Sequence, residues 1–365
     1  MAITPHAQSD AEAGRTALRD VRVFDGRELS PPRTVVIDGG VIGTDASGAR
    51  VVEAGGAVLL PGLIDAHIHL YDRDSLRRLR DHGVTTGLDM ATWSLELLAS
   101  LRGIPGLTDI RSAGTAALGP GGQHAKFPGV PADAIVLDPE QARRFVDTRV
   151  AEGSDYLKIV AEAPGQGGPD QSVLDALTAA AHAHGRKVVV HATNTDAYSM
   201  ARAAGADLIT HAPLDRPLSA EEAAAVAAEG RVVIPTLTMM EGVAAATGRS
   251  FAAATGSVAA LHRAGVPILA GTDANSQPGV PFQVAHGESL HHELELLVAA
   301  GLSTLDALRA ATVLPARHFG LDDRGAIEPG LRADLVLVDG DPLADIRATR
   351  AVRTVWCGGV EHSPT

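Results

Sequence analysis

Two histidines separated by one residue, His67 and His69, are the first positions whose types and spacing suit chemistry. They end a short apolar segment that follows a Pro-Gly turn at 61–62. Side chains two positions apart on a β-strand point to the same side, so both imidazoles project together. Such a pair suits a divalent metal ion, although the spacing alone fits a polar pair without metal equally well. Its meaning therefore depends on the rest of the chain.

Residues of metal-binding types recur where later apolar segments end. Lys158 lies within one such segment, His191 and His211 each end one, and Asp273 directly follows another. Taken singly, either histidine suits a hydrogen-bonded core position, and Asp273 suits the cap of a following helix. Lys158 differs, because a buried ammonium is costly unless it has a carboxylate partner or is chemically converted. So many residues of metal-binding types at strand ends are hard to obtain by chance. We predict that they form one site for zinc or a similar ion.

The elements that must position these residues alternate between strand and helix, which is typical of an α/β fold. Eight apolar segments in roughly 230 residues predict a (β/α)8 TIM barrel, in which the carboxyl ends of all strands face one mouth. A doubly wound open sheet is the alternative, but no Gly-x-Gly-x-x-Gly turn follows the first strand. The predicted strands are 64–69, 84–88, 109–115, 156–160, 188–191, 208–211, 232–236 and 268–272. The clearest predicted helices are 139–152, 171–184, 219–229 and 251–264.

Both ends of the chain carry short β-type runs broken by Asp-Gly and Pro-Gly turns. We predict a small antiparallel sheet over 16–60, which pairs with 325–360 as one composite β-sandwich. The barrel is then expected to occupy 61–324, and residues 1–15 to form a disordered leader.

Composition excludes several classes of function. The 365 residues carry a formal net charge of −13, which argues against nucleic-acid binding. The single cysteine, Cys357, rules out an intramolecular disulfide, and no apolar run approaches the roughly 18 residues of a membrane span. Residues 1–15 lack the basic start and the apolar core that a signal peptide has. We therefore expect a cytoplasmic homo-oligomer that acts on a small-molecule substrate, without membrane or nucleic-acid partners.

The ordered set of motifs resembles the metal-dependent amidohydrolase superfamily. The resemblance rests on Pro-Gly-Leu-Ile-Asp-Ala-His-Ile-His at 61–69, followed by Lys158, His191, His211 and Asp273. The segment 325–336 is similar to the phrase with which many members return to the sandwich, and 292–303 is similar to the imidazolonepropionase-like and prolidase-like branch.

The resemblance implies a role for each ligand-type residue. His67, His69 and Asp273 are expected to hold the more buried metal ion, and His191 and His211 the second. Lys158 is expected to react with CO2 and to bridge both ions as a carbamate. Two Zn²⁺ ions are expected, with other divalent ions possible. A mononuclear site with unmodified Lys158 is the alternative.

The expected mechanism uses a metal-activated hydroxide, with Asp273 as general base and then general acid. His124, in a Gly-rich loop after the third strand, is expected to donate to the substrate carbonyl, unless it is an exposed loop histidine. Further substrate contacts are assigned to strand-to-helix loops, where Arg216 is the one obvious cation for a free carboxylate. These predicted contacts are Tyr71, Glu162, Arg216 and His286.

Hydrolysis of a C–N amide bond suits this constellation best, because an amine leaves poorly until it is protonated. The expected substrate is an N-acyl amino acid, a dipeptide-like compound or a cyclic amide. Alternatives within the enzyme class are a mononuclear deaminase or cyclic amidohydrolase, or a lactonase or esterase on the same site. The alternative outside it is a silent barrel that serves as a binding subunit.

Overall fold

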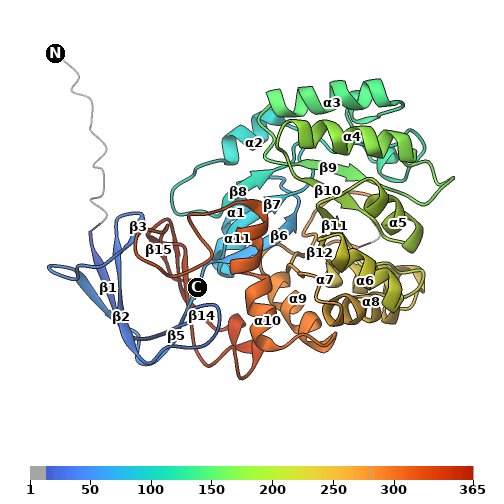
Figure 1. Ribbon diagram of the computed structural model, residues 1–365. Coiled ribbons are helices and arrows are strands. Elements are labelled where there is room, and N and C mark those ends of the chain that lie inside the picture. Colours follow the sequence, from blue (N-terminus) through green and yellow to red (C-terminus); the bar gives the residue numbers. More distant parts are fainter. Residues whose placement is uncertain (1–13, 281, 365) are drawn as a thin grey trace, which may run out of the picture.

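Two parallel sheets form the centre of the larger part of the molecule (Figure 1). The computed structural model describes residues 14–280 and 282–364, so most of the predicted leader lies outside the described residues. One sheet has the order β6-β7-β8 and the other β12-β11-β10-β9. Their strands are β6 (Leu63–Ile68), β7 (Val84–Asp89), β8 (Asp109–Ser112), β9 (Leu157–Val160), β10 (Val188–His191), β11 (Leu208–Thr210) and β12 (Val232–Ile234).

Backbone hydrogen bonds join these two sheets on both sides. Between β8 and β9, the Ala117 amide donates to the Lys158 carbonyl at 2.9 Å. On the other side, the predicted eighth strand, 268–272, is not a regular strand but still occupies the place between β12 and β6. Its Leu269 amide donates to Val233, and the Ala66 amide donates to Ala270, each at 2.9 Å. The predicted (β/α)8 fold is confirmed, with an irregular eighth position.

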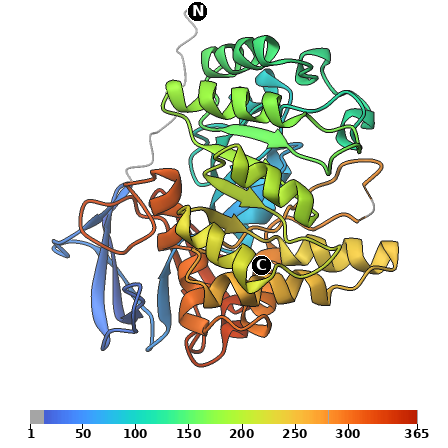
Figure 2. The ribbon, with the colours of Figure 1, turned by 45° about the vertical axis from the view of Figure 1, so that its right-hand side comes forward.

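Helices surround the parallel strands on the outside (Figures 1 and 2). The four clearest predicted helices are all present within about a residue of the expected ends, and Ser219 and Glu222 form the predicted capping box of α6. In the described residues we find no helix with the length and hydrophobicity that a bilayer crossing requires. The helices are α1 (Arg73–Asp81), α2 (Leu95–Leu101), α3 (Pro139–Ala151), α4 (Gln171–Ala183), α5 (Thr195–Ala203), α6 (Ala220–Ala228), α7 (Leu237–Thr247), α8 (Ala252–Arg263), α9 (Glu288–Ala299), α10 (Thr304–Ala310) and α11 (Val313–Phe319).

Strands from both chain ends pair in one further sheet, which lies beside the barrel, at left in Figure 1. β13 runs antiparallel to β5, and the two ends share a buried cluster that includes Leu18, Leu59 and Trp356. The expectation of a purely antiparallel sheet over 16–60 is wrong, because β4 and β5 both pair parallel with β1. The strands are β1 (Thr16–Val23), β2 (Arg33–Asp38), β3 (Val41–Gly43), β4 (Arg50–Glu53), β5 (Val58–Pro61), β13 (Leu335–Val338), β14 (Val352–Cys357) and β15 (Val360–His362).

β4 runs parallel to β1 because of the connection between β3 and β4, residues 44–49. β3 is antiparallel to β2, which is antiparallel to β1, so β3 already runs in the direction of β1. The chain then crosses back before β4 and lies on a different edge of β1. The division of the chain into two domains, a β-sandwich of 16–60 plus 325–360 and a barrel of 61–324, stays a prediction.

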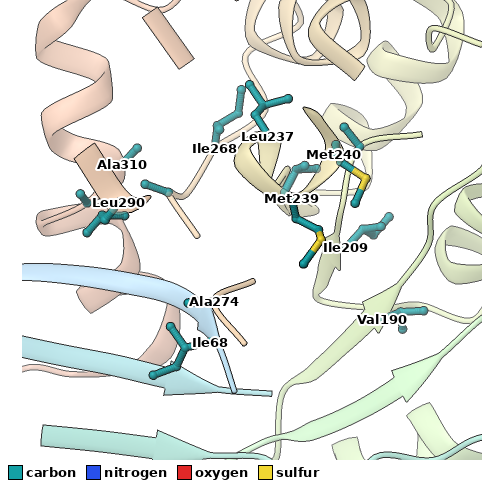
Figure 3. Close-up of a cluster of buried hydrophobic side chains, with 14 of the residues drawn as sticks. Ile68, Val190, Ile209, Leu237, Met239, Met240, Ile268, Ala274, Leu290 and Ala310 are labelled. Carbon is teal, nitrogen blue, oxygen red and sulfur yellow. The ribbon is translucent and has the colours of Figure 1, made fainter. Parts of the chain in front are cut away.

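A large buried apolar cluster holds most of the outer helices to the barrel strands (Figure 3). On its α7 side it contains Leu237, Met239 and Met240, all at most 5% exposed, and Ile209 of β11. Leu290 of α9 belongs to the same cluster. Complete burial of such side chains stabilises a fold by about 1.5–3 kcal/mol each. The start of α7 and the face of α9 are therefore firmly placed near the strand ends.

Gly271, in the irregular eighth position, allows this segment to approach β6 closely. A Cβ there would lie 2.5 Å from Cγ2 of Ile234 and 2.9 Å from the backbone nitrogen of His67. We expect Gly271→Ala to lower the free energy of unfolding by about 1–3 kcal/mol through overpacking, measured by urea unfolding. Gly40→Ala is the control, since its nearest contact, the Gly358 carbonyl, is at an ordinary 3.5 Å. Equal losses in both variants would contradict this expectation.

Candidate metal centre

His67, His69 and Asp273 lie together at the carboxyl ends of the first and eighth barrel positions. Nε2 of His69 is 2.9 Å from Oδ1 of Asp273, and Nε2 of His67 is 3.3 Å from the same oxygen. Among residues 14–280 and 282–364 this is the one group of three or more potential ligands whose donor atoms all lie within 4.8 Å. The structure thus brings together the three residues predicted to hold the more buried ion.

Two threonines fix the orientation of two of the imidazoles. Nδ1 of His67 is 2.6 Å from Oγ1 of Thr210, and Nδ1 of His211 is 2.8 Å from Oγ1 of Thr236. A partner on one ring nitrogen sets the tautomer and directs the other nitrogen, here Nε2, towards a ligand position. Sequence reasoning missed both threonines. Each is a polar residue at a predicted strand end, but its partner depends on the register between strands.

His191 lies beside His211, as the prediction of a second metal position requires. The two rings are in an edge-to-face contact with centroids 4.2 Å apart. His191 also makes an edge-to-face contact with His124, at 4.6 Å between centroids. The ring of His67 is 5.0 Å from that of His211, so a continuous row of imidazoles leads from the loop histidine to the three-residue group.

Lys158 is buried on β9, only 3% exposed, and in the part of the chain that the structure describes its Nζ has no hydrogen-bond partner. Burial lowers the pKa of Lys158 to about 7, although the negative charges of Asp273 and Asp89 act in the opposite direction. Its own charge contributes to the lowered pKa values of the neighbouring histidines. Burying an ammonium group without a partner is energetically costly. Conversion of the Lys158 amine to an anionic metal ligand would remove this cost.

His67, His191 and His211 are in the neutral form that binds metals. Burial lowers the pKa of His211 to about 3, and burial also lowers the pKa values of His67 and His191 well below the usual range. Neutral imidazoles offer a lone pair at neutral pH. Burial acts to raise the pKa of Asp273, but the hydrogen bond and charge of His69 outweigh it, so the net pKa is lowered. Asp273 is therefore a carboxylate.

Backbone strain concentrates at the same strand ends. His211, Thr236 and Asp273 have φ values of 74°, 47° and 60°, and Asp20 is the one other described non-glycine residue with positive φ. Such conformations cost about 1–3 kcal/mol each and persist where the surroundings fix them, typically at functional sites. The left-handed backbone of Asp273 turns the chain directly after the eighth position.

Asp65, two residues before His67, ties the two segments that carry the three-residue group. Its carboxylate accepts hydrogen bonds from the amide and hydroxyl of Thr272, at 3.0 and 2.7 Å, and from the amide of His67, at 3.2 Å. Burial raises its pKa to about 7. Sequence reasoning assigned no role to Asp65, although a carboxylate in an apolar strand was a visible signal.

Glu162 holds the loop that carries His124. Its Oε1 accepts a hydrogen bond from the Gln123 amide at 2.7 Å and lies 3.8 Å from Nδ1 of His124. Close to this contact, the Gly121 amide donates to the Gly167 carbonyl at 3.0 Å, so the two loops are joined. The carboxylate of Glu162, a predicted substrate contact, is thus already bound to residues of the protein itself. His124 lies over His191.

The other predicted substrate contacts lie in different settings. Nε2 of His286 donates to the His69 carbonyl at 2.7 Å, and its ring is 6.4 Å from that of Tyr71. These two residues therefore lie beside the three-residue group. Arg216 is half exposed and forms a bidentate ion pair with Glu222, at 2.7 and 2.8 Å. Its charge is already compensated.

Removing the Glu162 carboxylate should release His124 without disturbing the predicted metal ligands. We expect Glu162→Ala to lower kcat/KM at least about tenfold, since a hydrogen bond to a charged group is typically worth about 1.5–3 kcal/mol. Metal content should stay at the wild-type value. Steady-state kinetics and elemental analysis measure both. Glu140→Ala, which removes a surface carboxylate paired with Arg144, is the control, and equal kinetics in the two variants would contradict the role of Glu162.

Comparison with known proteins identifies relatives over most of the chain. A sequence profile described as the Amidohydrolase family matches residues 58–361. An uncharacterized protein of Mycobacterium tuberculosis (strain H37Rv) is 30% identical over 341 residues, which cover 84% of this chain and 85% of the relative. An adenine deaminase of Methylobacterium sp. (strain 4-46) is 30% identical over 362 residues, which cover 94% of this chain and 57% of the deaminase.

A similar solved structure is that of a Xaa-Pro dipeptidase with methionine bound in its active site. Its TM-score is 0.83 at 23% sequence identity, and the alignment covers 96% of this chain and all of the dipeptidase chain. At this identity the likeness establishes the fold and leaves the substrate open.

Proposed function

Because the chain belongs to the amidohydrolase family and is an enzyme acting on C–N bonds, we propose that it is a metal-dependent hydrolase of an amide bond. The substrate class is a small N-acyl amino acid, dipeptide-like compound or cyclic amide. One observation carries the proposal. Donor atoms of His67, His69 and Asp273 converge within 4.8 Å of one another, and the nearby Lys158 is buried with no hydrogen-bond partner among the described residues.

The residues present fit two divalent ions. His67, His69 and Asp273 would hold one, His191 and His211 the other, and Lys158, converted to a carbamate by CO2, both. Neutral imidazoles and carboxylate-type oxygens suit zinc, and the conversion removes the cost of a buried ammonium. Such ions supply a water of lowered pKa as nucleophile and an electrophile for the substrate carbonyl.

Asp273 is the proton carrier in this mechanism. Its carboxylate takes a proton from the water as oxygen attacks the carbonyl carbon, and it returns that proton to the amide nitrogen as the C–N bond breaks. The products are a carboxylic acid and an amine, so all atoms of one water are used. Protonation of the nitrogen is the step that makes the amine a competent leaving group. The side chain is 14% exposed, which leaves it accessible to substrate.

His124 and Tyr71 are the proposed groups that orient the substrate. His124, held by Glu162 and packed on His191, donates to the carbonyl oxygen as it gains negative charge. Burial raises the pKa of Tyr71 above its usual range, so its phenol is a donor at neutral pH. His286 supports the His69 backbone, and Arg216 keeps its predicted contact only if a substrate carboxylate displaces Glu222.

Deamination is the second candidate, and one observation favours it: the adenine deaminase match spans 94% of this chain. A deaminase uses the same attack by water but expels ammonia from a ring carbon. The buried Lys158 favours a binuclear amide hydrolase instead, because a mononuclear site gives its Nζ no function. A lactonase or esterase would need less help from Asp273, since alkoxides leave more readily.

A substrate panel on zinc-loaded protein tests the proposal. The panel contains N-acyl amino acids, dipeptides, cyclic imides, lactones and adenine, with products identified by mass spectrometry. We expect release of an amine and a carboxylate from at least one amide. Ammonia release from adenine alone would replace the proposal by deamination, and turnover of lactones alone would replace it by esterase chemistry. Absence of any turnover would favour the silent binding subunit.

A further inference from the structure

Glu293 is a buried carboxylate of α9 that the proposed mechanism does not use. It is fully buried, and its oxygens accept hydrogen bonds from the amide of Leu237 at 2.9 Å and from the amide and hydroxyl of Thr238 at 2.7 and 2.9 Å. These amides belong to the first turn of α7, whose N–H groups have no partner within their own helix. Glu293 therefore caps α7 from a different helix.

This arrangement frees the residue that ordinarily performs the capping. Thr236 precedes α7 in the N-cap position, and threonine there usually accepts a hydrogen bond from its own helix. Its side chain makes no such bond, and its Oγ1 lies 2.8 Å from Nδ1 of His211 instead. Because Glu293 satisfies the helix start, the Thr236 hydroxyl is available to orient the histidine.

Thr236 needs this external support because its backbone is strained. Its φ and ψ of 47° and 50° are left-handed values, which are unfavourable for a β-branched residue. The hydrogen bonds of Glu293 fix the two residues that follow, Leu237 and Thr238. The apolar cluster that includes Leu237 and Leu290 presses α7 and α9 onto the same barrel (Figure 3). α9 thus supports the backbone directly after Thr236.

We propose that Glu293 is a positioning residue of the metal centre, acting through the start of α7 and Thr236 on His211. The proposal rests on the proposed metal-dependent function. Outer hydrogen-bond partners of metal ligands typically change metal affinity by about 10- to 100-fold when they are removed. Glu293 stands one step further out, because it holds the two residues that follow the strained Thr236.

The test compares three variants with wild type for zinc affinity, by competition with a chelator, and for thermal unfolding of the metal-free protein. Glu293→Gln keeps the side-chain shape but places an amide nitrogen against hydrogen-bond donors. We expect its affinity for the ion at His211 to fall about 10- to 100-fold. Thr236→Val, which lacks the hydroxyl, should show the same loss, whereas Thr236→Ser should bind zinc as wild type does.

His291→Ala is the matched control for general destabilisation. His291 is buried on the same helix, but its Nδ1 pairs with Oγ1 of Thr349, 3.0 Å away, in the 3-10 helix Ile346–Arg350 rather than with α7. It should unfold at a lower temperature with unchanged zinc affinity. The proposal is overturned if Glu293→Gln behaves like His291→Ala, or, should Glu293→Gln not fold, if Thr236→Val binds zinc normally. Wild-type protein that binds no zinc would instead overturn the proposed function, and this role with it.

Discussion

Replacing Asp273 by asparagine is expected to lower kcat by at least about a hundredfold on the amide substrate found in the panel. The estimate is the lower range of what a positioned acid and base contributes. Asparagine keeps the size of the side chain and an oxygen that faces the two histidines. In the wild-type protein, Nε2 of His67 and Nε2 of His69 lie 3.3 and 2.9 Å from Oδ1 of Asp273. It cannot accept the proton of the water or return it to the leaving nitrogen.

The comparison of amide and ester substrates makes this result specific. An amine must be protonated as it leaves and an alkoxide needs less help, so Asp273→Asn should lose more activity on an amide than on its matched ester. Asp322→Asn, on an exposed carboxylate of the loop after α11, is the control and should keep wild-type kinetics. A loss below about tenfold on the amide, with metal content unchanged, would remove Asp273 from the proton-carrying role.

Replacing Lys158 by alanine is expected to remove one of the two metal ions and to lower turnover by about a hundredfold or more. Loss of a hydrogen-bond partner of a metal ligand typically lowers metal affinity or activity by about 10- to 100-fold, and loss of a ligand should lower turnover at least as much. The reason is the loss of the one group proposed to touch both ions. Elemental analysis gives the metal count. Acetate or propionate should restore part of the activity, because a small carboxylate fills the space and supplies the missing oxygens.

Lys158→Met separates this chemical role from a packing role. Methionine matches the length of the apolar stem but removes a buried Nζ that has no hydrogen-bond partner within residues 14–280 and 282–364. The metal-free variant should therefore unfold at the same or a higher temperature than metal-free wild type, while its turnover falls as in Lys158→Ala. Wild-type metal content in Lys158→Ala, or activity in wild type that is indifferent to bicarbonate, would contradict the carbamate.

The features that could be predicted from sequence are those encoded locally. Alternating strand and helix patterns specify a barrel, and the carboxyl ends of its strands must meet at one mouth. His67, His69 and Asp273 could therefore be expected together although more than 200 residues separate Asp273 from the pair, and the structure brings them together. The resemblance to the amidohydrolase superfamily is confirmed by the match over 58–361.

The features that escaped prediction depend on contacts between distant segments. The pairing of Thr236 with His211, and of Glu293 with the start of α7, requires the register of two strands and the placement of a later helix. Glu162 could be recognised as a loop carboxylate, but its bond to the Gln123 amide depends on how two glycine-rich loops meet. No local pattern indicates the irregular eighth position or the left-handed backbone of Asp273.

Titration of metal-stripped protein with zinc, while amine release from the best amide of the panel is followed, tests the central claim most directly. We expect no measurable hydrolysis without metal and a rise that reaches its plateau at two zinc ions per chain, in the presence of bicarbonate. A plateau at one ion would establish the mononuclear alternative. Hydrolysis that survives complete removal of metal would contradict a metal centre built on His67, His69 and Asp273.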